Sequence, residues 1–179
     1  KNKHKLIDSF NTEEKKLLDV GCGTGDFLKV CQLKGWSVVG VEPNKNARER
    51  ANKKLCTKGG EKIKESISEL ENTQYDVITL WHVLEHIPNL DSYIKTLKSR
   101  LKKSGVLIIA VPNYKSYDAF HYKNFWAAFD VPRHLYHFSR ISIQRLFSKV
   151  KMEVIGILPM KFDAYYVAML SEKNKTGKT

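Results

Sequence analysis

Three glycines at alternate positions, Gly21, Gly23 and Gly25, constrain this chain more than any other feature. They follow a short apolar run at residues 17–20, and a segment suited to a helix begins at Asp26. Glycine lets the backbone bend sharply and lets a ligand approach without a Cβ in the way. The amide groups at the start of the next helix can bind an electron-rich group. The pattern therefore predicts a strand, a ligand-binding turn and a helix.

Two carboxylates accompany this turn. Asp19 lies inside the apolar run, where a buried charge is costly unless a partner such as a ligand is nearby. Glu42 ends a second apolar segment, 21 residues after Gly21, and in doubly wound folds an acid at that place binds ribose hydroxyls. The alternatives are a tight strand–helix connection without a ligand and an exposed Glu before Pro43. The joint occurrence of the acids and the glycines disfavours both.

The segment Asp19-Val-Gly-Cys-Gly-Thr-Gly25 resembles the first motif of class I S-adenosylmethionine-dependent methyltransferases, and the similarity extends over residues 16–170. The resemblance implies a doubly wound, Rossmann-like α/β fold, with a mostly parallel sheet of the seven-stranded type flanked by helices. A nicotinamide-binding turn more often reads G-x-G-x-x-G, and here the third glycine comes one residue early. A nicotinamide-dependent dehydrogenase is therefore the second choice.

The resemblance also implies S-adenosylmethionine as the cofactor and a set of residues that bind it. Ser66 and Ile67 are expected near the adenine, and a Leu-Glu-His segment after the strand at 75–81 is similar to many small-molecule methyltransferases. The tetrapeptide of base N-methyltransferases, of the Asn-Pro-Pro-Tyr type, is absent there. The expected cofactor-binding residues are Asp19, Gly21, Cys22, Gly23, Gly25, Glu42, Pro43, Ser66, Ile67, Trp81 and His82.

Hydrophobic periodicity predicts the remaining elements. Helices are expected at 26–34, 45–56, 89–103 and 139–150, and strands at 37–42, 61–64, 75–81, 106–111 and 152–158. The strand at 106–111 should be fully buried. The segment 162–170 is apolar without a clear type, and 171–179 has the composition of a polar tail. The closing antiparallel strand of the resembled fold either lies within 164–170 or is missing from the chain.

Nine aromatic side chains are concentrated in residues 114–138, a segment without helical or strand periodicity. It follows the fifth strand, so it should lie over the carboxyl ends of the strands, where ligands bind. We interpret residues 1–179 as a single domain in which 114–138 are inserted as a mobile aromatic cap. The alternative is a surface subdomain that only packs on itself.

Methyl transfer from a sulfonium is an in-line displacement that needs alignment and exclusion of water, with a general base for some acceptors. His82, His86, His134 and His137 are the candidate bases, although a lone histidine is more often structural. The stretch at 131–138 combines two imidazoles, an Arg and aromatic side chains, so His134 and His137 are favoured. Arg133 is expected to bind a substrate carboxylate or phosphate, and Tyr114 and Trp126 to line the acceptor pocket. No metal site is predicted, because nothing beyond residue type supports the group of Asp130, His134 and His137.

The net charge of +12 raises the question of a nucleic-acid partner. Residues 45–64 carry eight Lys or Arg, and residues 95–103 carry five. The first segment includes the helix after the second strand, and the second segment belongs to the helix after the fourth strand. The resembled fold places these two helices on opposite faces of the sheet. A nucleic-acid groove needs its charge on one face, so nucleic acid is less favoured than solvated basic surfaces. An acidic small molecule or carrier protein stays open as the acceptor.

The predicted function is S-adenosylmethionine-dependent methyl transfer to an oxygen or nitrogen of a small-molecule or carrier-bound acceptor. The alternatives are an RNA methyltransferase that uses the basic surface and the dehydrogenase. No apolar run approaches the roughly 20 residues of a membrane span, and the basic residues 1–5 precede no signal-peptide core. The expected location is therefore the cytoplasm, without a membrane partner. The oligomeric state is not readable.

Overall fold

The computed structural model describes residues 3–10, 12–55 and 62–177, and the chain divides into two compact units. The first, here called the sheet unit, comprises Lys1–Val83 and Lys95–Ala110. The second, here called the helical unit, comprises Leu84–Ile94 and Val111–Thr179. The expectation of a single domain with an aromatic cap stays a prediction.

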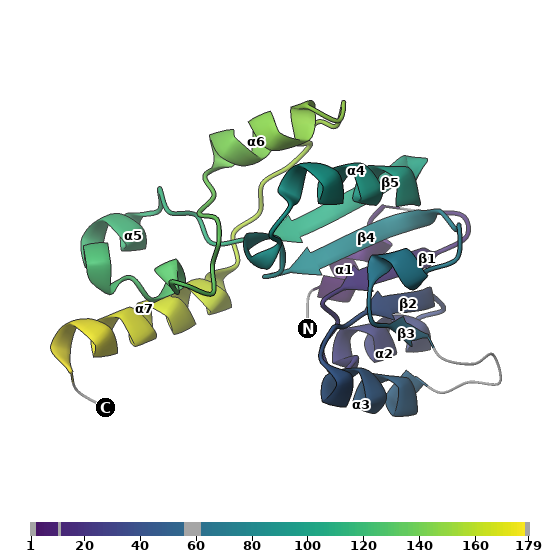
Figure 1. Cartoon of the computed structure of the whole chain (residues 1–179), viewed down its shortest axis with the longest axis horizontal. Coiled ribbons are helices and arrows are strands. Elements are labelled where there is room, and N and C mark those ends of the chain that lie inside the picture. The colour runs from purple at the N-terminus through teal and green to yellow at the C-terminus, as the bar shows by residue number, and fades with distance from the viewer. Residues whose placement is uncertain (1–2, 11, 56–61, 178–179) are drawn as a thin grey trace. The chain divides into compact units, whose positions relative to one another are not determined.

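Five parallel strands form the sheet, in the order β3-β2-β1-β4-β5 (Figure 1). They are β1 (Lys16–Val20), β2 (Ser37–Val41), β3 (Ile63–Lys64), β4 (Tyr75–Trp81) and β5 (Leu101–Ala110). From β1 the chain moves to β2 and β3 on one side and then crosses to β4 and β5 on the other. Ligands bind at such a reversal, beyond the carboxyl ends of the strands. The predicted doubly wound, Rossmann-like α/β fold is confirmed, and the glycine turn follows β1 at the reversal.

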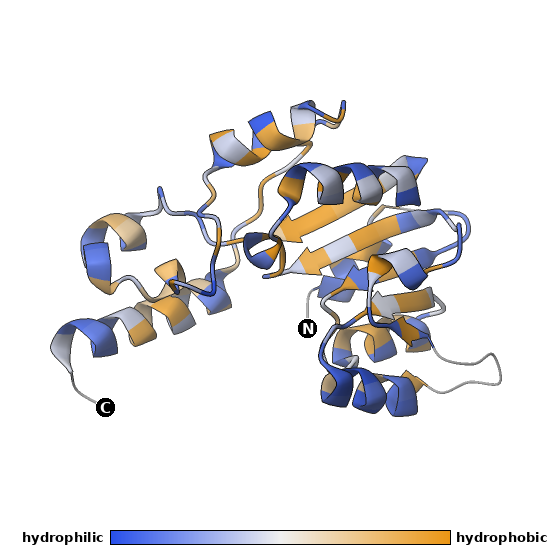
Figure 2. Cartoon of the chain, viewed as in Figure 1, coloured by the Kyte–Doolittle hydropathy of each residue, from blue (hydrophilic) through white to orange (hydrophobic). Residues whose placement is uncertain are grey.

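The helices of the sheet unit bury narrow apolar stripes. They include α1 (Lys3–Asp8), α2 (Asp26–Leu33) and α3 (Lys45–Leu55). The helix now called α3 was predicted to end at Cys56, which lies outside the described residues. Leu28 of α2 and Leu55 of α3 are fully buried in one cluster with Leu17 of β1. Burial of each such side chain stabilises the fold by about 2 kcal/mol. Figure 2 shows α3 as mostly hydrophilic, as expected for a stripe this narrow.

The predicted helix at 89–103 is wrong at its end. The helix α4 (Leu90–Arg100) stops earlier, and β5 begins at Leu101. Leu101 pairs with Tyr75 of β4 and is 5% exposed. Leu101 continues the apolar pattern of the helix in the sequence. Its pairing with Tyr75 and its burial nevertheless place it in the strand.

A bulge interrupts β5 before Val106. The register between β4 and β5 shifts between Tyr75 and Val77. A Cβ at Gly105 would come within 3.0 Å of the Tyr75 carbonyl oxygen, so glycine suits this close approach. Beyond the bulge, residues 106–109 are half-buried. The prediction of a fully buried strand is wrong there, because β5 is the last strand of the described sheet.

Helical elements of three to 16 residues make up most of the helical unit, which also includes the first residues of α4. They are η2 (Leu84–His86), α5 (Tyr117–Tyr122), η3 (Lys123–Phe125), η4 (Ala127–Phe129), α6 (Arg140–Ser148) and α7 (Lys161–Thr176). The predicted helix at 139–150 is confirmed as α6, with Ser139 as its N-cap.

The segment 114–138, expected to lack regular structure, contains three helical turns. Ala119, Trp126 and Ala128 bury together there.

The predicted sixth strand at 152–158 is wrong. These residues form neither helix nor strand, and Ile155 and Leu158 are 77% and 66% exposed. The alternative place for a closing strand, 164–170, is also wrong, because it lies within α7. The predicted polar tail continues that helix as far as Thr176. No helix in the described part of the chain is long and apolar enough to span a membrane.

Ser171 connects α7 to the aromatic segment. It is fully buried. Its hydroxyl accepts a hydrogen bond from the N–H of Ala127 at 2.8 Å and donates to the carbonyl oxygen of Val167 at 2.7 Å. A polar residue is expected on this face of α7, because the Ala127 N–H would otherwise lose its partner on burial.

We expect Ser171→Ala to lower the free energy of unfolding by ~1–2 kcal/mol, because the Ala127 N–H loses its acceptor. Urea unfolding followed by circular dichroism measures this change. The matched control is Ser148→Ala, whose exposed hydroxyl donates only to the Arg145 carbonyl. It should shift the free energy by less than ~0.5 kcal/mol. Equal effects of the two substitutions would contradict the assigned role of Ser171.

Candidate functional site

The glycine turn bends the chain from β1 into α2. Gly21, Gly23 and Gly25 have φ values of 71°, 55° and 76°. The N–H groups of Gly21 and Cys22 both donate to the carbonyl oxygen of Val41, at 2.7 and 3.1 Å. These bonds connect the turn to the carboxyl end of β2, so the turn lies between the ends of the two strands.

Two of the glycines serve different purposes. At Gly21 a Cβ would collide with the side chain of Val83, so glycine is needed there for packing. At Gly23 a Cβ would meet no atom within 4 Å. Space beside a positive-φ backbone is what a ligand lying against the turn requires. The backbone therefore fits a cofactor at Gly23.

Glu42 is bound to the turn through its side chain. Its Oε2 accepts a hydrogen bond from the N–H of Gly23 at 2.8 Å, and its Oε1 accepts one from the N–H of Asn44 at 2.9 Å. A carboxylate oxygen has lone pairs for a second bond, and Glu42 is only half-buried. The carboxylate is thus oriented by two backbone groups and retains acceptor capacity for a diol. Pro43, which follows it, is exposed.

Asp19 is 2% exposed, and its partner is another strand residue. Thr79, directly opposite on β4, donates its hydroxyl to the Asp19 Oδ1 at 2.6 Å. Burial raises the pKa of the Asp19 carboxyl to about 7, against the opposing effects of the Thr79 bond and the Lys3 charge. The sequence predicted a partner for this carboxylate but did not identify Thr79. The one signal for Thr79 is a hydroxyl inside an apolar strand.

Cys22 fills the interior side of the turn. Burial raises the pKa of its thiol to about 12, and the charges of Asp19 and Glu42 act in the same direction. Its small side chain also fits beside Gly40, where a Cβ would come within 2.7 Å of the Cys22 sulfur. The structure therefore gives Cys22 a packing position at the turn.

Trp81 ends β4 and is covered by an aromatic ring and a cation. Phe27 of α2 meets it edge-on at a centroid distance of 5.7 Å, and the Lys3 ammonium lies 4.1 Å from the ring centroid. His82 follows with a φ of 58°, and its N–H donates to the Ala110 carbonyl at 3.0 Å. Sequence reasoning missed Lys3, because nothing in the pattern of α1 places it near β4.

Ser66 and Ile67 lie just after β3. The Ser66 hydroxyl is 2.6 Å from that of Ser68 and donates to Glu69 at 3.2 Å, while Ile67 begins the turn η1 (Ile67–Glu69). Both side chains are half-buried. All the residues predicted to bind the cofactor belong to the sheet unit.

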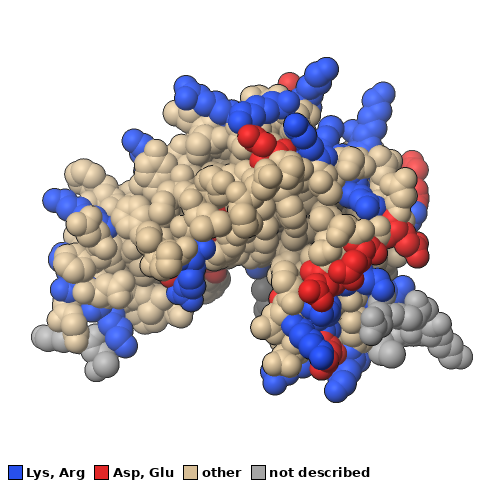
Figure 3. Space-filling view, in the orientation of Figure 1, with Lys and Arg blue, Asp and Glu red and all other residues tan. Residues whose placement is uncertain are grey.

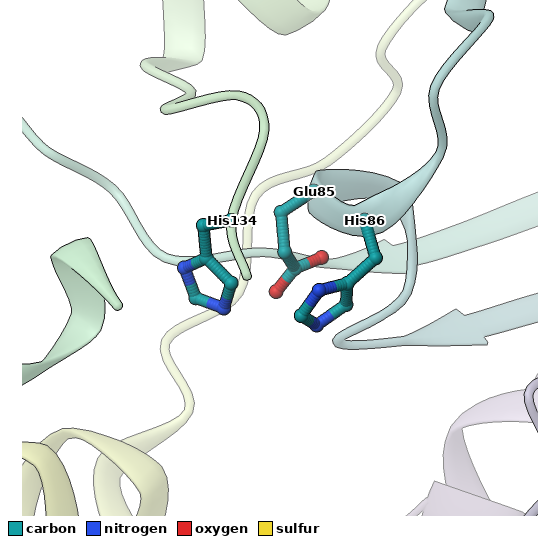
Figure 4. A group of neighbouring side chains, drawn as sticks. All are labelled: Glu85, His86 and His134. Atoms are coloured by element: carbon teal, nitrogen blue, oxygen red, sulfur yellow. The ribbon is translucent and has the colours of Figure 1, made fainter. Parts of the chain in front are cut away.

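The helical unit brings Glu85 and His86 of η2 close to His134 (Figure 4). Glu85 is 1% exposed. The Nδ1 atom of His86 bonds to the Arg133 carbonyl at 2.8 Å, and that of His134 to the Ala128 carbonyl at 2.9 Å. The rings of His86 and His134 are 4.8 Å apart. Glu85 was not among the predicted site residues, and His86 was considered only as a less favoured candidate base.

The other predicted acceptor-side residues are placed differently. The Nε2 of His137 bonds to the Phe129 carbonyl at 2.8 Å. Arg133, expected to hold a substrate anion, donates instead to Asp130 through Nη2 at 2.6 Å, although its side chain is 77% exposed. Tyr114 is 38% exposed, whereas Trp126 is 5% exposed within the apolar cluster of this unit. Their part in acceptor binding stays a prediction.

The basic side chains of the described residues do not form a single patch on the face shown in Figure 3. Figure 3 shows Lys and Arg distributed over several parts of the face in view, with Asp and Glu among them. Several of the cations are paired. Arg48 contacts Glu65 at 2.7 Å, and Lys54 contacts Asp26 at 2.7 Å.

A family model described as "Methyltransferase domain" matches residues 1–155. The ubiquinone biosynthesis O-methyltransferase of Rickettsia prowazekii is 34% identical over 114 residues, which cover 61% of this chain and 45% of that protein. The enzyme of the same name from Pelagibacter ubique is 37% identical over 108 residues, 57% of this chain and 45% of that protein. The chain thus spans less than half the length of these relatives.

Solved structures share the fold. A SAM-dependent methyltransferase from Archaeoglobus fulgidus aligns with a TM-score of 0.61 at 17% identity, over 96% of this chain and 84% of that one. Magnesium protoporphyrin IX methyltransferase from Synechocystis, solved with bound SAH, aligns with a TM-score of 0.61 at 19% identity. That alignment covers 88% of this chain and 74% of that one.

The raised pKa of Asp19 makes stability pH-dependent. Because the pKa of the Asp19 carboxyl in the folded chain, about 7, exceeds its ordinary value of 3.8, the unfavourable contribution of Asp19 to stability is absent well below pH 3.8 and grows as the pH rises to 7. We expect Asp19→Asn to remove this contribution, which is on the order of 3 kcal/mol between pH 5 and pH 8. Urea unfolding at both pH values, for both proteins, measures the difference.

The control for this experiment is Asp26→Asn. Asp26 is exposed, and its hydrogen bond from Lys54 lowers the pKa of its carboxyl, so it does not titrate between pH 5 and pH 8. This variant should keep the pH dependence of the wild type. An unchanged pH dependence in Asp19→Asn would show that burial does not raise the Asp19 pKa into this range.

Proposed function

The chain belongs to the methyltransferase-domain family, and from this premise we propose that it transfers the methyl group of S-adenosylmethionine to a small-molecule acceptor. The observation that carries the proposal is the bond between the Gly23 N–H and the Glu42 carboxylate. It sets a diol-binding acid beside a turn with space for a ligand. Family membership also argues against the dehydrogenase that the glycine spacing left open.

The cofactor is assigned to the sheet unit. Glu42 accepts hydrogen bonds from the two ribose hydroxyls, since a carboxylate can serve a vicinal diol. The backbone at Gly23 lies against the cofactor, and Ser66 and Ile67 face its adenine. Asp19 lies one residue before the end of β1, and Trp81 ends the neighbouring strand β4. Both are at the topological reversal, where the remainder of the cofactor binds. Gly21, Cys22, Gly25, Pro43 and His82 complete this proposed site.

The acceptor atom is an oxygen in this proposal. The relatives described above are O-methyltransferases of ubiquinone biosynthesis by name, and methyl transfer to an oxygen is the simplest extension to this chain. A hydroxyl acceptor must lose its proton during transfer. His134 and His137 are the proposed groups on the acceptor side, with Arg133, Tyr114 and Trp126 as the predicted surroundings.

We expect Glu42→Ala to weaken the binding of S-adenosylhomocysteine at least tenfold in isothermal titration calorimetry. The reason is the loss of charge-assisted bonds to the ribose, each worth about 1.5–3 kcal/mol. Glu49→Ala, an exposed acid on α3, is the control and should bind like the wild type. Binding of a nicotinamide dinucleotide in place of S-adenosylhomocysteine would overturn the cofactor assignment.

The acceptor class is tested with methyl-labelled S-adenosylmethionine and a cell extract divided into small-molecule, RNA and protein fractions. We expect label in the small-molecule fraction, in a product that forms only with active protein. The Glu42→Ala variant should reduce that label at limiting cofactor. Label confined to RNA would favour the RNA methyltransferase, and label confined to protein would also contradict the proposal.

A further inference from the structure

Glu85, His86 and His134 bring three metal-ligating groups together in the helical unit, and we propose that they bind a Zn²⁺-type transition-metal ion. Their ligand atoms lie within 4.8 Å of one another. Figure 4 shows the Glu85 carboxylate between the two imidazole rings. Two imidazoles and one carboxylate form a donor set found in catalytic zinc sites.

The two histidines are oriented as metal ligands usually are. The Nδ1 atoms of both rings bond to backbone carbonyl oxygens, of Arg133 and Ala128. A carbonyl can only accept, so in the neutral ring each Nδ1 carries the proton and each Nε2 carries the lone pair. A hydrogen bond of this kind to the second nitrogen fixes the tautomer and orientation of most metal-bound histidines.

Backbone contacts hold the two contributing segments against each other. The Glu85 carbonyl accepts hydrogen bonds from the N–H groups of Leu135 and Tyr136, at 2.9 and 3.3 Å. The Tyr136 hydroxyl donates to the Pro88 carbonyl at 2.9 Å. The ligands of η2 and the ligand at position 134 therefore belong to one rigid local structure, which reduces the ordering that metal binding requires.

Small side-chain movements would complete the site. Ligand atoms around a tetrahedral zinc lie about 3.4 Å apart at the usual metal–ligand distances. Two ligand atoms at the 4.8 Å limit of this group would therefore have to approach by about 1.4 Å. The side chain of His134 is 10% exposed and Glu85 is buried, whereas His86 is exposed and gives the ion a path from solvent. A bound cation would also offset the cost of keeping a carboxylate in this interior.

The donor set selects the metal. Imidazole nitrogens suit zinc and its first-row neighbours, whereas Mg²⁺ and Ca²⁺ prefer oxygen ligands. This group also differs from the set considered from sequence, Asp130 with His134 and His137. Asp130 binds Arg133 through Oδ1, and its Oδ2 lies 3.8 Å from the Nε2 of His134. The Nε2 of His137 bonds to a carbonyl. His134 is therefore the one residue that the two sets share.

Three protein ligands leave a coordination position for water. His134 would act as a ligand in this site, since a nitrogen that binds the metal has no lone pair for a proton. Metal binding at this group does not depend on the proposed function.

The test is Zn²⁺ binding to the full chain, measured by competition with a chromogenic chelator, with Co²⁺ absorption as a report of coordination geometry. We expect about one equivalent of Zn²⁺, and at least tenfold weaker binding in His86→Ala and in His134→Ala. His137→Ala, from the same segment, is the matched control and should bind like the wild type. Circular dichroism establishes that each variant is folded.

Absence of Zn²⁺ binding by the wild type, unchanged binding in His134→Ala, or an equal loss in His137→Ala would overturn the metal site. None of these measurements involves the cofactor or turnover. The calorimetry of Glu42→Ala tests cofactor binding separately, so the failure of one proposal is distinguishable from the failure of the other.

Discussion

The hydrogen bond from the Gly23 N–H to the Glu42 carboxylate connects the glycine turn after β1 to the acid that follows β2. This hydrogen bond forms only if the chain turns sharply directly after β1 and if the carboxyl end of β2 lies beside that turn. The first condition requires the positive φ angles of the glycines, and the second requires the in-register pairing of β1 with β2. Strand register, turn conformation and acid placement thus depend on one another at this point.

A similar dependence holds across the sheet at Asp19. The parallel register of β1 and β4 sets Thr79 directly opposite Asp19, and the hydroxyl satisfies one oxygen of a nearly inaccessible carboxylate. A shift of one of these strands by one residue would place the two side chains on opposite faces of the sheet. The central strands therefore combine apolar burial with one specific polar contact, which favours a single pairing over others.

Sequence reasoning succeeded where the determining interactions are local. The glycine turn, its two acids and the helix after it are encoded within some 25 residues, and all were predicted. The Thr79 partner and the grouping of His86 with His134 were not, because each joins segments that only the folded chain brings together. The error at Leu101 has a related cause: helical spacing is a local signal, and pairing with Tyr75 overrode it. At 152–158 the apolar residues suggested a strand, but none of the described strands pairs with them.

Cys22 adds a chemical consequence to the packing of the turn. With a thiol pKa of about 12, on the order of one molecule in 100,000 carries a thiolate at pH 7, and the thiolate is the nucleophilic form. A sulfonium cofactor is an alkylating agent toward such nucleophiles. A cysteine held protonated inside the proposed cofactor turn is therefore inert toward the reagent that the turn would hold, and it is equally resistant to oxidation.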